Sequence, residues 1–379
     1  MKNLTLGLRI TLVTGIPLLI GLSVFLFLKS YFLNPTEAGN KQKISFMVAP
    51  GTAFSKISEQ LVEQNFVKHA LIPRIIAGLK GIDTRTIKAG EYELSRGMTP
   101  PAIIAKLASG DIVKRKVTIT EGMTIRDVGR LVAAAGLANE IDFWKTLHDP
   151  LLLKRWGVEG DSFEGYLFPN TYFFSLPIKP EEIIYTMMKE GEKIWPDEYT
   201  NQANLLNMTR HEVLTLASII EKESGDVSEQ PMISSVFHNR LNKGMKLQAD
   251  PTVIYGVGEF NGNLTKADLE TPTPYNTYTN FGLPPGPIGN PGKNAIHAAL
   301  YPAKSDYLYF VANATGKHTF SNQLPEHNKA VSELIESGNG QPEKEAKAKM
   351  GSPASPLANN TVSLRSTPKA PLISSKEKP

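Results

Sequence analysis

The sequence predicts an α+β protein that is attached to a membrane by a single N-terminal transmembrane helix. Three observations lead to this prediction. Residues 10–28 form one apolar run without any charge. The following chain alternates short patterns of period two, typical of strands, with apolar residues spaced three and four apart, typical of helices. Its length of 379 residues suffices for two or three folded domains.

The apolar run is long enough to cross a bilayer. As a helix it spans roughly 28 Å, close to the thickness of one hydrocarbon core. A cleavable signal peptide, the alternative, has a shorter apolar region and a small-residue cleavage site, and the sequence around Lys29 offers a poor one. We therefore expect an uncleaved anchor at 10–28 and a polar linker at 29–43, while the charges on the two sides of the run do not decide its orientation. Either alternative exports the rest of the chain.

Composition excludes several classes of function. The 41 basic and 37 acidic residues give a net charge of only +4, whereas nucleic-acid binding usually requires a strongly basic surface. The absence of cysteine excludes disulfides, thiolate metal sites and a cysteine nucleophile. The seven histidines include no pair spaced four apart, and the sequence contains no HExxH motif, P-loop or GxSxG motif. We therefore expect no metal and no cofactor.

The folded part divides into two predicted domains and a tail. Residues 44–142 contain a weak repeat, in which a strand, a glycine turn and a helix occur near Gly51 and again near Gly122. This pattern suggests a small α+β domain of the size of a LysM-type carbohydrate-binding domain, with an ordinary spacer domain as the alternative. A second, mixed α+β domain is expected at 143–336. Residues 337–379 are rich in Ser, Pro and Lys, and we expect them to be disordered.

A helix that ends in two carboxylates is the first candidate for chemistry. A capping box begins it at Thr209, and an almost wholly apolar run leads to Glu221 and Glu223. A carboxyl held against apolar surface has a raised pKa, which suits a general acid that protonates a glycosidic oxygen. Periodicity alone does not choose between the two residues. The plain alternative is that both only solvate the end of a helix.

Three further segments offer polar and aromatic side chains for a sugar. Aromatic faces stack on sugar rings, while Asn and Thr side chains hydrogen-bond to hydroxyl and acetamido groups. A loop of four prolines and four glycines at 282–292 restricts the backbone and could line a cleft at little entropic cost. Taken singly, each segment is equally typical of a turn or a core tyrosine. The candidate binding or supporting residues are Glu223, Asn239, Gln248, Asp250, Thr252, Tyr255, Tyr275, Asn276, Thr277 and Tyr278.

Together these segments resemble one family. The motifs are EGYLFPNTY (164–172), ASIIEKESG (217–225), SVFHNRL (235–241), GMKLQADPTVIYG (244–256), YNTYTNFGLPPGPIGNPG (275–292) and HTFSNQLPEHNKAV (318–331). They are similar to those of the MltG or YceG-like family of endolytic murein transglycosylases, over roughly residues 44 to 336. The sequence departs from the expected pattern at Asn170, where an aspartate is expected, so an acid role at this position is in doubt.

The resemblance implies a single-pass inner-membrane protein with a cytoplasmic N-terminus at 1–9. Its LysM-like domain at 44–142 and its catalytic domain at 143–336 would then lie in the periplasm. It implies cleavage of the β-1,4 bond between N-acetylmuramic acid and N-acetylglucosamine within nascent glycan strands, which leaves 1,6-anhydro ends and terminates elongation. Glu221 matches the family's catalytic glutamate. The implied partners are peptidoglycan strands, the inner membrane and peptidoglycan synthases, with no nucleic acid.

Two alternatives stay open. An inverting muramidase would use Glu221 together with Glu223 or Asp250, because such enzymes need a second carboxylate to activate water. A non-catalytic scaffold of the cell-wall synthesis machinery would bind peptidoglycan through a degenerate site. The products separate the first alternative from a transglycosylase, since only a transglycosylase leaves anhydro ends.

Overall fold

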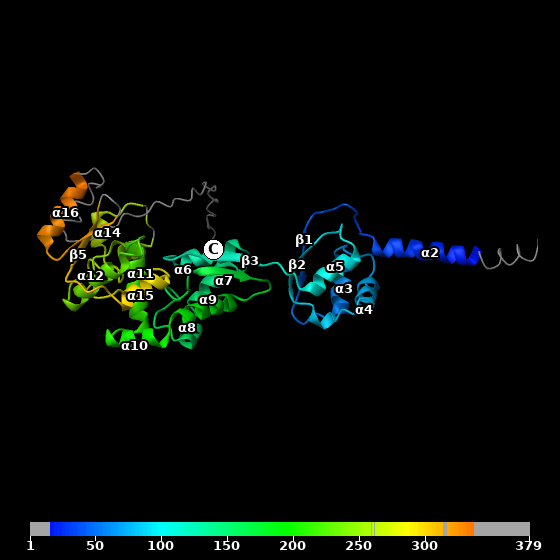
Figure 1. Ribbon diagram of the computed structural model, residues 1–379, viewed down its shortest axis with the longest axis horizontal. Coiled ribbons are helices and arrows are strands. Elements are labelled where there is room, and N and C mark those ends of the chain that lie inside the picture. The colour runs from blue at the N-terminus through cyan, green and yellow to red at the C-terminus, as the bar shows by residue number, and fades with distance from the viewer. Residues whose placement is uncertain (1–15, 259, 261, 314–316, 337–379) are drawn as a thin grey trace, which may run out of the picture. The chain divides into compact units, whose positions relative to one another are not determined.

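A computed structural model describes residues 16–258, 260, 262–313 and 317–336 of the chain. The predicted cytoplasmic N-terminus and the predicted disordered tail lie outside these residues. The chain forms two compact units, Met1–Pro196 and Asp197–Pro379 (Figure 1), which we call the first and the second unit. Both combine helices with two-stranded antiparallel sheets, so the fold is mixed α+β.

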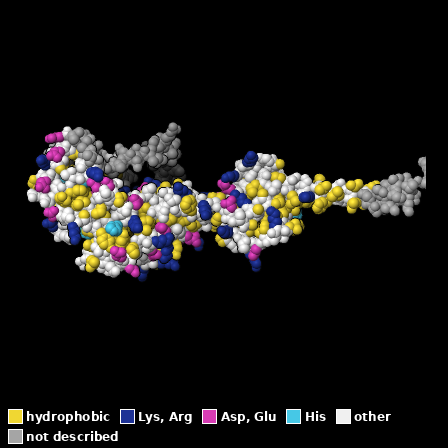
Figure 2. Space-filling view, in the orientation of Figure 1, with side chains coloured by type: hydrophobic (Ala, Val, Ile, Leu, Met, Phe, Trp, Pro, Cys, Tyr) yellow, Lys and Arg dark blue, Asp and Glu magenta, His cyan; other side chains and the backbone are white. Residues whose placement is uncertain are grey.

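The first unit begins with an exposed apolar helix. Helix α2 (Ile16–Leu33) has a mean hydropathy of 2.0 and buries none of its residues. Figure 2 shows its surface covered by hydrophobic side chains. By length and composition, α2 could cross a membrane. It continues five residues beyond the predicted end at residue 28, and its last residue, Leu33, packs against the core of the domain that follows.

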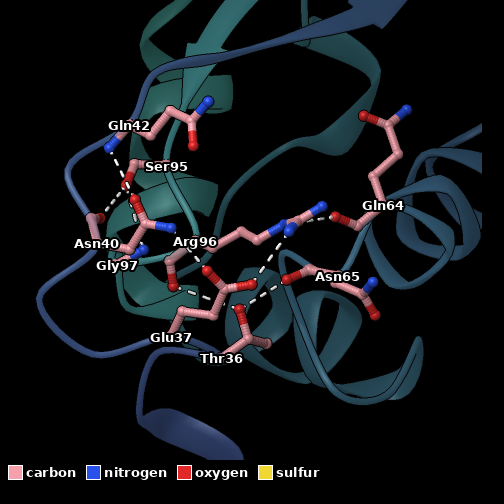
Figure 3. A network of polar contacts seen from close by, with 9 residues as sticks. All are labelled: Thr36, Glu37, Asn40, Gln42, Gln64, Asn65, Ser95, Arg96 and Gly97. Carbon is pink, nitrogen blue, oxygen red and sulfur yellow. Dashed lines mark hydrogen bonds and ion pairs between the residues drawn. The ribbon is translucent and has the colours of Figure 1, made fainter.

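The polar segment after α2 is fixed to that domain by a network of hydrogen bonds (Figure 3). The Arg96 guanidinium forms an ion pair with Glu37 at 3.0 Å. The Thr36 hydroxyl donates to the carbonyl of Asn65 at 2.6 Å, and the Ser95 hydroxyl donates to the carbonyl of Asn40. The predicted linker is therefore part of the folded unit and does not act as a free tether.

The first module of this unit places two helices between two paired strands. Strands β1 and β2 are antiparallel, with Ile44 opposite Leu94 and Val48 opposite Gly90. Their apolar side chains and the inner faces of the helices form one core around Phe46. The elements are β1 (Ile44–Val48), α3 (Phe54–Glu63), α4 (Leu71–Leu79), a 3₁₀ turn (Thr84–Thr86), β2 (Gly90–Leu94) and α5 (Pro100–Ser109).

The second module repeats the order of strand, helices and antiparallel strand. Gly51 and Gly122 occupy the same place after the first strand of each module, with φ of 75° and 76°, a left-handed conformation that favours glycine. The predicted repeat is thus present in the backbone. The elements are β3 (Arg115–Ile119), α6 (Ile125–Ala134), α7 (Glu140–Leu147), α8 (Pro150–Trp156), β4 (Asn170–Phe174) and α9 (Pro180–Ile194).

The predicted domain boundary at 142/143 differs from the division in the structure. Strand β4 pairs with β3, with Arg115 opposite Phe174, so the polypeptide from β3 to β4 belongs to one module. The Glu164 carboxylate, buried in this module, accepts the backbone N–H of Ile125 at 3.0 Å and so caps α6. The division between units falls instead at Pro196.

The second unit is built around helix α11, which packs against α12, α13 and α15. Figure 1 shows α11 and α15 side by side. Nearly all side chains of α11 after its first turn are buried. The elements are α10 (Asp197–Leu205), α11 (Arg210–Glu223), α12 (Gln230–Asn242), α13 (Asp250–Val257), α14 (Lys266–Glu270), α15 (Lys293–Leu300), β5 (Tyr309–Ala312), β6 (His318–Ser321) and α16 (Leu324–Glu336).

Candidate active site

Helix α11 carries the two candidate carboxylates at its C-terminal end. Its start is fixed by the predicted capping box, in which the Thr209 hydroxyl accepts the N–H of Glu212 at 3.2 Å and the Glu212 carboxylate accepts the N–H of Thr209 at 2.8 Å. Apolar side chains bury the middle of the helix, and the backbone becomes extended at Ser224. The helix therefore ends at a defined place with respect to the surrounding core.

The two carboxylates point in different directions. Residues two apart on an α-helix are rotated by about 200° around its axis. Glu223 is 1% exposed, whereas Glu221 is half-buried. The alternative that both residues only solvate a helix end therefore does not fit Glu223, and Glu221 is the member of the pair with exposed surface.

The loop of prolines and glycines runs along α11 and ends at Glu221. Three hydrogen bonds connect the two segments. A ring nitrogen of His211 bonds to the carbonyl of Pro285 at 2.8 Å, the N–H of Ile288 donates to the Ser218 hydroxyl at 3.0 Å, and the N–H of Gly292 donates to Glu221 Oε2 at 3.0 Å.

These contacts give the loop a defined role. The three side chains that α11 contributes occur at helix positions i, i+7 and i+10, which lie on one face. The loop follows this face in the same direction as the helix. It thereby places the N–H of Gly292 against the carboxylate.

Glu221 also lies at the start of a second helix. Gly292 is the N-cap residue of α15, and the N-terminus of a helix stabilises negative charge. The carboxylate of Glu221 therefore meets a backbone N–H at the start of α15.

Glu223 belongs to a buried charged cluster around Arg240. The Arg240 side chain is 1% exposed and donates to the carbonyls of Leu308 at 2.7 Å and Leu247 at 2.9 Å. Burial lowers the pKa of Arg240 to about 10, and Tyr309, Tyr278 and then Glu223 act in the opposite direction. Glu223 is therefore one of several groups near a buried cation and does not face the surface.

Asp250 and Tyr278 form a second buried pair beside this cluster. The Tyr278 hydroxyl donates to Asp250 Oδ1 at 2.6 Å. Burial, followed by the Asp250 carboxylate, raises the pKa of Tyr278 well above its usual range. Both side chains are buried, so Asp250 does not face the surface as Glu221 does, and the ring of Tyr278 is largely enclosed by protein.

Three other predicted residues hold the backbone near this pair. The Thr277 hydroxyl accepts the N–H of Ala249 at 3.0 Å and is hydrogen-bonded to the Thr252 hydroxyl at 2.8 Å. The Asn276 amide donates to the carbonyls of two residues in the preceding segment and accepts the N–H of Tyr278 at 2.8 Å. All three are fully buried. Their contacts are typical of a scaffold that supports a site.

Two more of the predicted residues also contact backbone or buried groups. The Asn239 amide donates to the carbonyls of Ser305 and Tyr307, both at 2.9 Å. The Gln248 side chain accepts from Arg240 at 3.2 Å, and its backbone has a φ of 52°. Asn239 therefore holds the segment before β5, and Gln248 extends the cluster around Arg240.

The remaining predicted pair, Tyr255 and Tyr275, is half-buried. Their ring centroids lie 4.8 Å apart at an angle of 56°. Tyr275 lies against the loop of prolines and glycines, because a Cβ at Gly286 would be 3.6 Å from its hydroxyl oxygen. Among the predicted aromatic residues, this pair best combines exposed ring surface with proximity to the loop that contacts Glu221.

Two features of the site were missed by the sequence analysis. One is Arg240, which continues the apolar positions Ile233 and Phe237 of α12 at helical spacing, so a cation in an apolar stripe was the available signal. The other is the N–H of Gly292, a backbone group that no side-chain pattern indicates. In the part of the chain that the structure describes, no three or more His, Cys, Asp or Glu side chains gather as a metal site would require.

Comparison with known proteins confirms the resemblance. The YceG-like family matches residues 46–333. The endolytic murein transglycosylase of Bacillus subtilis (strain 168) is 36% identical over 343 residues, which cover 85% of this chain and 92% of that protein. The protein of the same name from Streptococcus pneumoniae serotype 2 is 31% identical over 338 residues, covering 80% of this chain and 61% of that protein.

A solved structure agrees with this result. The crystal structure of a yceG-like protein from Listeria monocytogenes is 40% identical, with a TM-score of 0.53, and the match covers 76% of this chain and 99% of that one. The family match spans more than half of the chain, from the first strand of the first module to the last helix of the second unit. The chain therefore belongs to the YceG-like family.

Proposed function

We propose that this protein is an endolytic murein transglycosylase that uses Glu221 as its single catalytic acid and base. The names of the relatives from Bacillus and Streptococcus support this activity. The observation that carries the mechanism is the difference in burial among the three candidate carboxylates. Glu221 is half-buried, whereas Glu223 and Asp250 are 1% and 4% exposed.

The same observation argues against an inverting muramidase. Such an enzyme places a second carboxylate across the scissile bond, about 6.5–9.5 Å from the acid, to activate water. Glu223 is rotated away on the helix and is enclosed beside Arg240. Asp250 is enclosed and accepts the hydroxyl of Tyr278. Neither carboxylate is available to a water molecule on a bound sugar.

One carboxyl group suffices for a transglycosylase. Protonated Glu221 donates its proton to the oxygen that links C1 of N-acetylmuramic acid to C4 of N-acetylglucosamine, and the C1–O bond breaks. The carboxylate then accepts the proton of the 6-hydroxyl of the same muramic acid while that oxygen bonds to C1. The products are a 1,6-anhydro end and a free 4-hydroxyl, and no water is consumed. An intramolecular nucleophile has a high effective concentration.

The Gly292 N–H orients the carboxylate in this mechanism. It holds Oε2 at 3.0 Å, and the loop contacts with His211 and Ser218 hold Gly292. The half-buried Tyr255 and Tyr275 are the proposed sugar-stacking residues. The buried residues from Glu223 to Tyr278 form the proposed support of the site.

The proposal extends to the rest of the chain. Helix α2 anchors the protein in the cytoplasmic membrane, and the two units lie on the side where peptidoglycan is found, the periplasm in a cell with two membranes. The first module, with two helices between antiparallel strands, supports the interpretation as a LysM-like glycan-binding module. Cleavage of nascent strands next to the membrane would end their elongation, which makes peptidoglycan synthases the expected partners.

Digestion of purified peptidoglycan tests the proposed activity. The full-length protein and its Glu221→Gln variant are incubated with intact glycan strands, and the fragments are identified by mass. We expect anhydro-muramic ends from the wild-type protein and none from the variant. Reducing muramic ends, heavier by one water, would indicate a muramidase. Absence of any cleavage by the wild-type protein, with glycan binding retained, would indicate a scaffold.

A further inference from the structure

Helix α4 presents an apolar stripe outside the core of the first module. Its inner side chains, Ile76 and Ala77, are buried. On its other side, Leu71, Ile75 and Leu79 occur four residues apart and therefore form one row along the helix. These three side chains are 52%, 53% and 83% exposed. A contiguous exposed apolar surface of this kind marks an interaction site.

The stripe continues into the surface of α2. An open groove of about 600 Å³ lies between the two helices. One wall of the groove is formed by the last turns of α2, with Phe25, Leu28 and Phe32. The other wall is formed by the exposed stripe of α4, with Leu71, Ile75 and Leu79. The groove thus extends the surface of the anchor at the level where α2 would leave the bilayer.

The two helices are held in this arrangement. Leu33 packs against the core of the first module, and the Lys68 ammonium lies over the Tyr31 ring, 4.1 Å from its centroid. The network of Figure 3 fixes the segment after α2 through Glu37 and Arg96. Helix α4 is therefore kept beside the last turns of α2 and is not free to move away on a tether.

The charge around the stripe also favours a lipid surface. Residues 64–81 contain the exposed cations Lys68, Arg74 and Lys80 and no acidic residue. An apolar helix face flanked by basic residues is typical of helices that lie in the interface of a membrane, and basic residues near a membrane are attracted to anionic lipids. A tyrosine at the end of the anchor, Tyr31, is likewise typical of this depth.

From these observations we infer that α4 is a membrane-docking helix, with its apolar stripe in the interfacial layer of the bilayer, acyl chains in the groove beside α2, and Lys68, Arg74 and Lys80 at anionic headgroups. This inference rests on the membrane span proposed above. The first module then lies directly on the membrane surface and does not project from it on a stalk.

Site-specific labelling of the full-length protein tests this inference, because a chain without cysteine accepts a single engineered thiol. An environment-sensitive fluorophore is attached in turn at Leu79→Cys, Leu22→Cys and Leu151→Cys. Leu22 lies in α2, and Leu151, on α8, is 80% exposed and matches Leu79 in that respect. Each protein is reconstituted into phosphatidylcholine vesicles that contain phosphatidylglycerol and, in parallel, lipid carrying a quencher near the headgroup or near the bilayer centre.

We expect the label at Leu79 to emit at shorter wavelength than the label at Leu151 and to lose most of its emission to the shallow quencher. The label at Leu22 should respond to the deep quencher. A Leu79 label that behaves like the Leu151 label, while the Leu22 label is quenched, would overturn the inference and leave the membrane span intact. A Leu22 label that is not quenched would overturn the span, and the inference with it.

The charge of the headgroups is tested by a second variant. Lys68→Gln, Arg74→Gln and Lys80→Gln are combined with the label at Leu79. In vesicles with phosphatidylglycerol we expect this variant to show less shallow quenching than the labelled parent, and in vesicles of phosphatidylcholine alone the two should agree. Equal quenching of the variant and the parent in both kinds of vesicle would contradict the role given to the cations.

Discussion

The two units of the chain bury different numbers of polar side chains. In the part of the chain that the structure describes, five buried polar or charged residues belong to the first unit and sixteen to the second. The charged pair of the first unit, Glu91 with Arg115, keeps part of both side chains in solvent, since 12% of one and 27% of the other is exposed. Two charged residues of the second unit, Glu223 and Arg240, are each 1% exposed, and a third, Asp250, is 4% exposed.

This difference separates the scaffold from the proposed site. Burial of a charge in an apolar interior costs free energy unless a partner and hydrogen bonds compensate it. In the first unit the most deeply buried carboxylate, Glu164, offsets part of this cost by accepting the N–H of Ile125. The second unit buries the charged side chains of Glu223 and Arg240 near the end of α11, close to the carboxylate that the proposed mechanism uses. We therefore expect substitutions in the second unit to have the larger effects, first on activity and then on stability.

The largest effect is expected from Glu221→Gln. Glutamine keeps the size of the side chain but cannot deliver a proton, so cleavage of glycan should fall by about 10²–10⁴-fold or more, because one group serves both halves of the reaction. The release of anhydro-muropeptides measures this loss. Lys222→Gln, at the exposed neighbouring position, is the matched control and should retain activity. Retention of most activity by Glu221→Gln would disprove its role.

The second effect is on stability. Arg240→Met removes a buried cation together with its hydrogen bonds to the carbonyls of Leu247 and Leu308, so we expect the free energy of unfolding to fall by about 3–5 kcal/mol. Arg115→Met in the first unit breaks a partly exposed pair and removes hydrogen bonds to the carbonyls of Ala135 and Gly136, and a smaller loss of about 1–2 kcal/mol is expected there. Urea unfolding of both variants measures the two values. Equal losses would contradict the comparison between the units.

Much of the fold is predictable from periodicity and capping. The capping box at Thr209 and the repeated strand, glycine turn and helix at Gly51 and Gly122 are local patterns that the structure confirms. The predicted boundary at 142/143 differs from the division in the structure because the pairing of β3 with β4 joins residues 51 to 59 positions apart. No local pattern carries such a contact.

The candidate site is only partly predictable, for a similar reason. The apolar run before Glu221 indicates a carboxylate on a buried helix. It does not say that Glu223 turns inward to Arg240, because helical periodicity gives both residues apolar neighbours. The orientation of Glu221 depends on Gly292, a backbone group 71 residues away. The polar residues from Thr252 to Tyr278 have the composition of a sugar site, but most of them are buried.

The third prediction compares the two carboxylates directly. Glu223→Gln removes the negative charge near the buried Arg240 guanidinium. Because this guanidinium then lacks that opposite charge, we expect the free energy of unfolding of this variant to fall by about 1–3 kcal/mol. Its loss of activity should be smaller than that of Glu221→Gln at a temperature where both variants are folded. Assays of glycan cleavage at that temperature measure the ratio. A larger loss of activity for Glu223→Gln would identify it as the acid.

A smaller effect is expected where the loop meets α11. Ser218→Ala leaves the buried N–H of Ile288 without its acceptor, at a cost of about 1–3 kcal/mol. Because this contact lies between those of His211 and Glu221, activity should also fall, while glycan binding is retained. Thr186→Ala in α9 also removes a hydroxyl, but its partner is a carbonyl of the same exposed helix turn, so it serves as the control. Unchanged activity of Ser218→Ala would show that the loop does not position Gly292.

The smallest effects are losses of stability at low pH, and they should begin at a different pH in each unit. Burial lowers the pKa of His238 in the second unit below its ordinary value of 6.5, against the opposing effect of its hydrogen bond to the carbonyl of Ala299. As the pH falls, the unfolded chain therefore binds a proton at His238 before the folded chain does. The stability contributed by neutral His238 is complete above pH 6.5 and is lost as the pH falls from 6.5 toward the pKa of the folded state.

Glu91 in the first unit titrates in a different range. The Ser45 hydroxyl and then Arg115 lower the pKa of Glu91 below its ordinary value of 4.5. Its contribution to stability, about 1 kcal/mol or less for a partly exposed pair, is complete above pH 4.5 and is lost as the pH falls from there toward the pKa of the folded state.

Urea unfolding of the wild-type protein, His238→Gln and Glu91→Gln at a series of decreasing pH values measures both contributions. The difference between wild type and His238→Gln should begin to change at 6.5, and the difference between wild type and Glu91→Gln should stay constant until 4.5. If the differences in the free energy of unfolding changed over the same range of pH for His238→Gln and Glu91→Gln, the expected separation between the two units would be contradicted.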